Sequence, residues 1–169
     1  STVSPSLTKR LGIGFAAQSG VLAALLASAG FPGAGELVQG KGGYYQFFFN
    51  QDGDYEVILD QLGKRFEIVE VGPKPYPSCR YTHPAVTGVL SLLGKHSLGC
   101  ADIAEVRVQI GARDMRSVGG WTDADKKNKY RPQGIVDAQF SIPYTVAATL
   151  VHGRLSLAEF TDDKLRNEE

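Results

Sequence analysis

A proline-rich segment divides this chain and limits how it can fold. Residues 72–77 read Gly-Pro-Lys-Pro-Tyr-Pro, with three prolines in five positions. Proline has no backbone N–H and disfavours helical geometry in the residue before it, so neither a helix nor a central strand can run through this segment. The segment therefore predicts a domain boundary near residue 71.

The composition is that of a globular protein. The chain has 169 residues, enough for one domain or for pieces of two. Hydrophobic residues make up 43% and charged residues 21%, which excludes a disordered or collagen-like chain. The 18 basic residues balance the 18 acidic ones, so we expect no general affinity for nucleic acid or an anionic membrane. Two cysteines make no disulfide framework and favour a cytoplasmic location.

The N-terminal part reads mainly as helix. Residues 1–8, rich in Ser, Thr and Pro, are expected to be a flexible lead-in. Residues 9–29 are rich in Gly, Ala and Leu, and their small residues recur at helical spacings, which is typical of a helix that closely approaches another. No window reaches eighteen consecutive apolar residues, so we expect this helix to be buried in protein rather than to span a membrane. A second helix is expected over residues 55–62 with Asp54 as its cap, and a strand over residues 66–71.

The C-terminal part reads as a mixture of helices and a strand. A helix is expected over residues 85–93, and a longer one over residues 135–151 with a kink at Pro143. Between them, Val106, Val108 and Ile110 alternate with polar residues, which predicts a strand. Residues 113–131 are polar and are expected to be a mobile loop. This part is therefore expected to mix helices with a strand.

The segment KPYPSCRYTHP at residues 74–84 concentrates chemically active side chains. It carries Lys74, Cys79, Arg80 and His83 on a backbone stiffened by prolines. A stiff loop with an ammonium, a guanidinium and an imidazole suits a multiply charged anion, and an imidazole exchanges protons near neutral pH. The alternative is that Lys74 and Arg80 are merely solvated and His83 caps the following helix. From the residues alone, both interpretations stay open.

Other motifs give weaker signals. Cys79-x3-His83 and His96-x3-Cys100 have the spacing of zinc ligands, but the intervening segment is an apolar helix that needs no metal to organise it. The sequence has no GxGxxG, GxxxxGK[ST] or GxSxG motif, so it predicts neither a nucleotide site nor a hydrolase triad. Tyr144, taken alone, would be a core tyrosine.

Three segments together resemble a known family. They are TKRLGIGFAAQSGVLAALLASAGFPG at residues 8–33, KPYPSCRYTHPA at residues 74–85 and DAQFSIPYTVAATLVHG at residues 137–153. In this order they resemble the MmgE/PrpD family, which includes 2-methylcitrate dehydratase, cis-aconitate decarboxylase and iminodisuccinate epimerase. The resemblance spans residues 7–163, and because members of the family are much longer, it implies an internal fragment.

The resemblance implies an α+β fold class and an assembly. Residues 1–70 would be part of an all-helical domain, and residues 71–169 would be most of a smaller α+β lid domain. The proline-rich loop would cross between the two domains at the active site. The full-length protein would be a homodimer.

The resemblance also implies a chemistry: lyase or isomerase reactions on small di- and tricarboxylates without a cofactor or metal. Dehydration of a hydroxy acid needs a base, an acid and cations that hold the carboxylates. By matching motifs, the catalytic residues would be Lys74, Tyr144 and His83. Substrate-binding residues would be Arg80, Cys79, Lys9 and Arg10.

Two departures from the family pattern bear on the reaction. The decarboxylase branch typically has histidine at the position of Cys79 and lysine at the position of Gln18. We therefore expect 2-methylcitrate-type dehydration first, epimerisation of a dicarboxylate second and decarboxylation of cis-aconitate third. The remaining alternative is an inactive fragment with a structural or partner-binding role.

Overall fold

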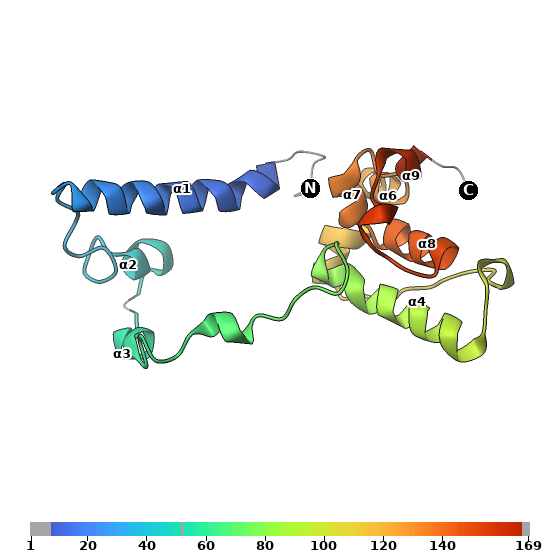
Figure 1. Ribbon diagram of the computed structural model, residues 1–169, viewed down its shortest axis with the longest axis horizontal. Helices are drawn as coiled ribbons and strands as arrows, with labels where there is room; N and C mark the ends of the chain where they lie inside the picture. Colours follow the sequence, from blue (N-terminus) through green and yellow to red (C-terminus); the bar gives the residue numbers. More distant parts are fainter. Residues whose placement is uncertain (1–7, 52, 167–169) are drawn as a thin grey trace. The chain divides into compact units, whose positions relative to one another are not determined.

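The computed structural model describes residues 8–51 and 53–166, so most of the expected N-terminal lead-in lies outside the described residues. The described chain divides by its internal contacts into two units (Figure 1). One unit comprises Arg10–Gly72, and the other comprises residues 8–9 and 73–166 of the described chain.

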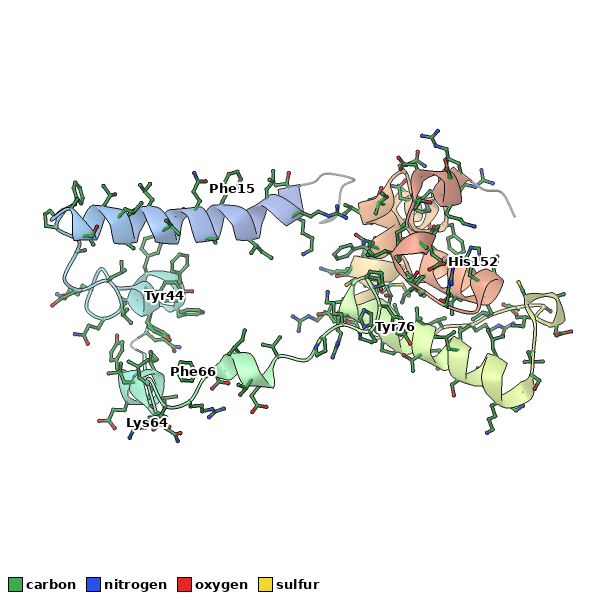
Figure 2. All side chains as sticks on the ribbon, viewed as in Figure 1. Phe15, Tyr44, Lys64, Phe66, Tyr76 and His152 are labelled. Atoms are coloured by element: carbon green, nitrogen blue, oxygen red, sulfur yellow. The ribbon has the colours of Figure 1, made fainter. Side chains whose placement is uncertain are left out.

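The N-terminal unit contains α1 (Thr8–Ser28) except for its first two residues, together with α2 (Tyr44–Phe49), α3 (Tyr55–Leu59) and the 3-10 helix η1 (Glu67–Glu70). The cap predicted for α3 is confirmed, because the Asp54 carboxylate accepts a hydrogen bond from the Val57 N–H at 3.3 Å. The prediction that the helix over residues 9–29 is buried is wrong. No residue of α1 is buried, and Phe15 projects from it with 59% of its surface exposed (Figure 2).

The exposure of α1 has a simple cause. No element of the described chain covers its apolar side chains, so large apolar residues from Leu11 to Leu26 are exposed. By length and composition alone, α1 is also the one helix of the described residues that could cross a membrane, with a mean hydropathy of 1.6 over its most apolar window.

The predicted α+β fold class is wrong, because residues 8–51 and 53–166 contain helices and turns but no strand. A strand exists only where a neighbouring strand exchanges backbone hydrogen bonds with it. Residues 106–110 run without such a partner, and their alternation instead places Val108 and Ile110 against the core. The other predicted strand, over residues 66–71, folds mostly as η1.

The C-terminal unit is organised around two packed helices, α4 (His83–His96) and α8 (Ile142–His152), which lie side by side (Figure 1). Val86 and Val89 of α4 are three residues apart and so lie on one face of the helix. The core forms two clusters of buried residues. They are Val86, Ala138, Leu155 and Phe160, and Val89, Val118, Ile142 and Val146.

Shorter helices surround this pair. Before α8 they are η2 (Arg80–Thr82), η3 (Cys100–Asp102), α5 (Ala112–Asp114), the π-helical turn η4 (Met115–Gly119), α6 (Asp123–Tyr130) and α7 (Ile135–Gln139). After α8 they are η5 (Leu157–Glu159) and α9 (Asp162–Arg166). The mobile loop predicted over residues 113–131 is therefore wrong. Within this polar segment, a capping box begins α6. The side chains of Thr122 and Asp125 each accept a hydrogen bond from the other residue's backbone N–H.

The long helix predicted over residues 135–151 is two helices instead of one kinked helix. α7 ends at Gln139, and Ser141 caps α8 by accepting a hydrogen bond from the Tyr144 N–H at 3.0 Å. Pro143 lies in the first turn of α8, where its missing N–H has no helical partner to lose. Proline therefore begins this helix and does not bend it.

Candidate active-site loop

The segment from Lys74 to His83 forms a loop that leads into α4, and two of its side chains share one acceptor. The Nζ of Lys74 donates to the carbonyl oxygen of Ser78 at 3.4 Å, and the Nε2 of His83 donates to the same oxygen at 3.3 Å. The Ser78 side chain is buried, whereas Lys74 is exposed. The loop therefore presents an accessible ammonium beside an enclosed imidazole.

His83 lies in a defined protonation state. A carbonyl oxygen only accepts hydrogen bonds, so the neutral ring carries its proton on Nε2 and leaves Nδ1 unprotonated. The residue is 6% exposed, and its Nδ1 is the one buried side-chain nitrogen or oxygen of the described residues that has no hydrogen-bond partner. Burial lowers the pKa of His83 below its usual 6.5, and the nearby charges of Arg80 and Lys74 lower it further.

His83 does not cap α4, contrary to the alternative prediction from the sequence. Thr82 precedes α4 without a side-chain cap, and the His83 ring turns to Ser78 and packs edge-on against Tyr76 at 5.2 Å between ring centroids. Tyr76 is labelled in Figure 2 at the start of α4. Its hydroxyl lies 3.2 Å from that of Thr87.

A hydroxyl pair stiffens the turn between Ser78 and His83. The Thr82 hydroxyl donates to the carbonyl of Cys79 at 2.9 Å, so Ser78 must donate to Thr82 across the 2.7 Å that separates their oxygens. Both residues are buried. Cys79 is half-buried and packs against the second core cluster, and Arg80 is exposed.

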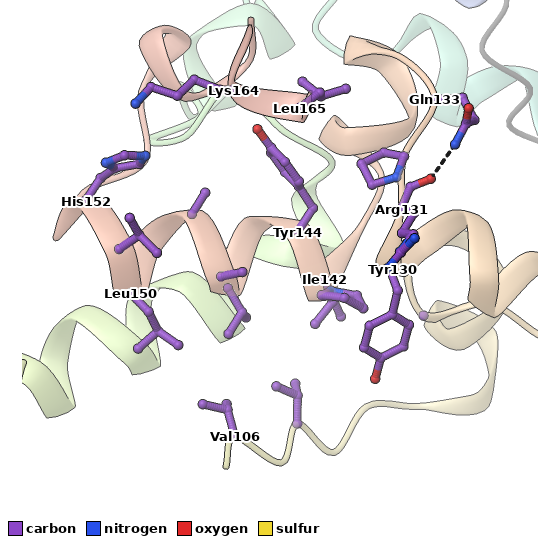
Figure 3. A pocket seen from close by; sticks show the side chains of 18 of the residues that line it. Val106, Tyr130, Arg131, Gln133, Ile142, Tyr144, Leu150, His152, Lys164 and Leu165 are labelled. Atoms are coloured by element: carbon purple, nitrogen blue, oxygen red, sulfur yellow. Dashed lines mark hydrogen bonds between the residues drawn. The ribbon is translucent and has the colours of Figure 1, made fainter. Parts of the chain in front are cut away.

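Tyr144 lies in a different environment. Its hydroxyl donates to the backbone carbonyl of Glu159 at 2.5 Å, and its ring packs against Phe160. It lines an open groove along α8, together with His152 and Lys164 (Figure 3). Burial and the Glu159 charge raise the pKa of Tyr144. No contact of the described residues joins its side chain to Lys74, Arg80 or His83, so its catalytic role stays a prediction.

Lys9 and Arg10 lie in the first turn of α1, and both are exposed. Their binding of substrate stays a prediction. The zinc-like set is not assembled, because His83 and His96 stand at opposite ends of α4, about 20 Å apart along the helix. Among the described residues, no group of three or more His, Cys, Asp or Glu side chains is close enough to hold a metal ion.

Sequence reasoning missed Gln139 and Lys129. The Gln139 side-chain amide donates to the carbonyl of Pro77 at 2.8 Å. Lys129 is 8% exposed, and its Nζ donates to two backbone carbonyls. Gln139 lies in residues 137–153, the third segment that resembles the MmgE/PrpD family, and this resemblance was a signal that the residue could matter. Lys129 stands in a run of charged residues, where nothing in the sequence separates a buried lysine from solvated ones.

This region of the chain is similar to known proteins. The sequence model of the MmgE/PrpD C-terminal domain matches residues 76–169, more than half of the chain. The chain belongs to the MmgE/PrpD family. The match covers Cys79, Arg80, His83 and Tyr144, and it begins two residues after Lys74.

Two curated relatives extend the similarity to nearly the whole chain. Both are named cis-aconitate decarboxylase, one from Aspergillus terreus and one from Aspergillus terreus strain NIH 2624 / FGSC A1156. Each is 28% identical over 176 residues, which is 96% of this chain and 35% of the relative. The chain therefore spans about a third of the length of these MmgE/PrpD relatives.

Proposed function

We propose that the full-length protein is a lyase of the MmgE/PrpD type that acts on a small di- or tricarboxylate without a cofactor. Family membership supports the reaction class. The observation that carries the proposal is the convergence of Lys74 and His83 on the Ser78 carbonyl, with Arg80 on the same loop. Cations bind the carboxylates, and a neutral imidazole beside them serves as a base.

Dehydration of a 2-methylcitrate-like hydroxy acid is the reaction we favour. In the proposed step, His83 takes the proton from the carbon beside a carboxylate, which requires substrate binding to open access to its buried Nδ1. The electrons of that C–H bond form the carbon–carbon double bond. The C–O bond breaks at the neighbouring carbon, and the hydroxyl leaves as water after it receives a proton. Lys74 is the group on this loop that can supply this proton and stabilise the enolate-like charge.

Tyr144, the acid predicted from the family resemblance, is less suited to that step. Its hydroxyl already donates to Glu159, so a proton transfer to substrate would require this bond to break. Breaking it would leave a backbone carbonyl without its partner, which costs free energy in a buried position.

Decarboxylation of a cis-aconitate-like acid is a second candidate. It is supported by the similarity to the two Aspergillus terreus proteins, at 28% identity. Cys79 and Gln18 count against it, because the decarboxylase branch typically has other residues there. Epimerisation of a dicarboxylate, which the sequence alone placed ahead of decarboxylation, is the other branch that the family resemblance allows. By the same resemblance we expect a cytoplasmic homodimer.

An assay panel on the full-length protein tests the proposal. We expect turnover of 2-methylcitrate, and the panel includes cis-aconitate and iminodisuccinate to separate the three branches. His83→Gln should abolish turnover, because a glutamine amide cannot take a proton. His96→Gln, at the exposed far end of α4, is the matched control. No turnover of any hydroxy, imino or unsaturated polycarboxylate would contradict the proposal.

A further inference from the structure

Gln139, the last residue of α7, holds the candidate loop at two points. Its backbone carbonyl accepts a hydrogen bond from the Cys79 N–H at 2.8 Å. Its side-chain amide donates to the carbonyl of Pro77 at 2.8 Å, across 62 positions of sequence. These two bonds flank Ser78, whose carbonyl is the acceptor for His83. The direction of that carbonyl is therefore set by a residue outside the loop.

Lys129 anchors the junction between α7 and α8. Its Nζ donates to the carbonyl of Phe140 at 2.7 Å and to that of Ser117 at 2.9 Å. In return, the hydroxyl of Ser141 donates to the Lys129 carbonyl at 2.5 Å. Buried ammonium groups are costly unless they are hydrogen-bonded and balanced by charge, and the buried Asp137 supplies part of that balance.

The two sets of bonds form one continuous connection. Phe140 and Ser141, which Lys129 holds, directly follow Gln139 in the chain. Burial lowers the pKa of Lys129, and the charges of Asp137 and then Asp125 oppose that shift. Neither Gln139 nor Lys129 contacts the Nδ1 of His83, which has no hydrogen-bond partner.

We propose that Gln139, anchored through Lys129, is a positioning residue that orients His83 by fixing the backbone on both sides of Ser78. The proposal rests on the proposed function, in which His83 is the base. A base must be held in place before substrate arrives, because a misplacement of about 1 Å can cost roughly 10²-fold in rate. The loop's own prolines stiffen its backbone, but Gln139 ties it to the folded core.

The test uses Gln139→Met in the full-length protein, since methionine keeps the length of the side chain and removes the amide. The first readout is alkylation of Cys79 by iodoacetamide, with the exposed Cys100 as the internal reference. We expect the ratio of the two rates to rise about five-fold, as the loss of one hydrogen bond of ordinary strength allows. The second readout is kinetic: kcat should fall about ten-fold or more with KM nearly unchanged.

Gln133→Met is the matched control. The Gln133 amide also donates to a backbone carbonyl, that of Arg131 at 3.0 Å, but on an exposed segment. We expect it to leave both the Cys79 rate and kcat unchanged.

Lys129→Met tests the anchor, with Lys126→Met of the same helix as its control, because Lys126 is exposed and pairs only with Asp123 in the described chain. Lys129→Met should raise Cys79 alkylation at least as much as Gln139→Met does, and Lys129→Arg, which keeps donors at this place, should restore part of the wild-type rate. If Lys129→Met does not fold, Gln139→Met decides alone.

The outcomes separate this proposal from the proposed function. An unchanged Cys79 rate in folded Gln139→Met overturns the positioning role, and so does an unchanged kcat in an active enzyme. A lower Tm with neither change would make Gln139 a purely structural residue, which also overturns the proposal. If the wild-type protein turns over no polycarboxylate, the proposed function fails, while the Cys79 rate still decides whether Gln139 fixes the loop.

Discussion

The Nζ of Lys74 and the Nε2 of His83 converge on a single atom, the carbonyl oxygen of Ser78, at 3.4 and 3.3 Å. Because both donors bind one acceptor, an ammonium and an imidazole lie close together, although eight residues separate Lys74 from His83 in the sequence. Burial is the largest cause that lowers the pKa of His83, and the charges of Arg80 and then Lys74 lower it further. Burial and the two cations therefore favour the neutral ring, which a base beside a carboxylate-binding group requires.

Lys74→Ala should lose far more turnover than stability. The lysine is exposed, and its one bond to Ser78 at 3.4 Å is long, so its removal costs little folding free energy. Removal of one preorganised stabiliser of developing charge typically costs roughly 10²–10³ in rate. Steady-state kinetics and urea unfolding of the same preparation measure the two effects. Lys95→Ala, at the exposed end of α4, is the control and should keep full activity. A Lys74→Ala enzyme with wild-type kcat/KM would remove Lys74 from the site.

The free energy of unfolding should depend on pH through His83. Its pKa is lowered in the folded protein, first by burial and then by Arg80 and Lys74, so the unfolded chain binds the proton more tightly. The stability that the neutral ring contributes is therefore fully present above the unfolded value of about 6.5, and it is lost as the pH falls through the lowered pKa. Urea unfolding between pH 5 and pH 8 checks this sign.

His83→Gln is the variant that isolates this effect. Glutamine keeps an N–H donor for the Ser78 carbonyl but does not titrate, so stability should become flatter across the same pH interval. In the wild-type protein, kcat/KM should fall as the pH decreases, because a protonated imidazole cannot act as a base. Equal pH slopes for the two proteins would mean that His83 keeps an ordinary pKa.

Tyr144→Phe should cost stability rather than catalysis. The Tyr144 hydroxyl donates to the Glu159 carbonyl, and its loss leaves that acceptor without this bond, at about 1 kcal/mol. The ring still packs against Phe160, so the fold is kept. We expect kcat to fall less than ten-fold. A loss of roughly 10² or more in kcat, beyond any effect on stability, would restore the catalytic role that the family resemblance implies.

The sequence predicted local features well where a single segment determines them. Asp54 caps α3 as expected, and the helix expected over residues 85–93 lies within α4. The chemistry of the 74–84 segment was also visible, because the basic residues and prolines that form it are adjacent in the chain. Which of these side chains meet was not visible, since the shared Ser78 carbonyl depends on the path of the backbone.

The failures concern features that need a distant partner. The alternation of Val106, Val108 and Ile110 records which side of the chain is apolar, but a strand also requires a neighbour, and the described chain provides none. Lys129 was assigned to a mobile loop because a lysine in a charged run is usually solvated. Its burial depends on carbonyls from Ser117 and Phe140, which only the tertiary fold brings to it.

The isolated 169-residue chain should associate in solution. α1 exposes Ile13 at 80% and Val21 at 62%, and α2 exposes Phe47 at 77%. Contiguous apolar surface of this kind is removed from water by contact with another molecule. Light scattering across a range of concentrations measures the mass, and Ile13→Ser with Val21→Ser should shift it towards the monomer. A monodisperse wild-type monomer that melts cooperatively would contradict this expectation.

Glu159 should be the most costly charge to remove from the C-terminal unit. It is 2% exposed and accepts hydrogen bonds from the Ser156 N–H at 2.6 Å, the Ser156 hydroxyl at 2.7 Å and the Arg154 Nε at 3.1 Å. Hydrogen bonds to charged groups contribute about 1.5–3 kcal/mol, so Glu159→Gln should lower the free energy of unfolding by about that amount. Arg154→Ala is the comparison, because the Arg154 side chain is 70% exposed and its ion pair should contribute only about 0–1 kcal/mol.

The pH dependence of Glu159 has a definite sign. Burial alone would raise its pKa, but the hydrogen bonds from Ser156 and Arg154 outweigh burial and hold the pKa below the ordinary 4.5. The stability from the ionised carboxylate is therefore present above pH 4.5 and is lost as the pH falls through the lowered value. Urea unfolding at pH 7 and at successive steps below pH 4.5 should show this loss in the wild-type protein and a smaller one in Glu159→Gln. If Arg154→Ala costs as much stability as Glu159→Gln, the ion pair and not the Ser156 bonds holds this carboxylate, because only the ion pair is lost in both variants.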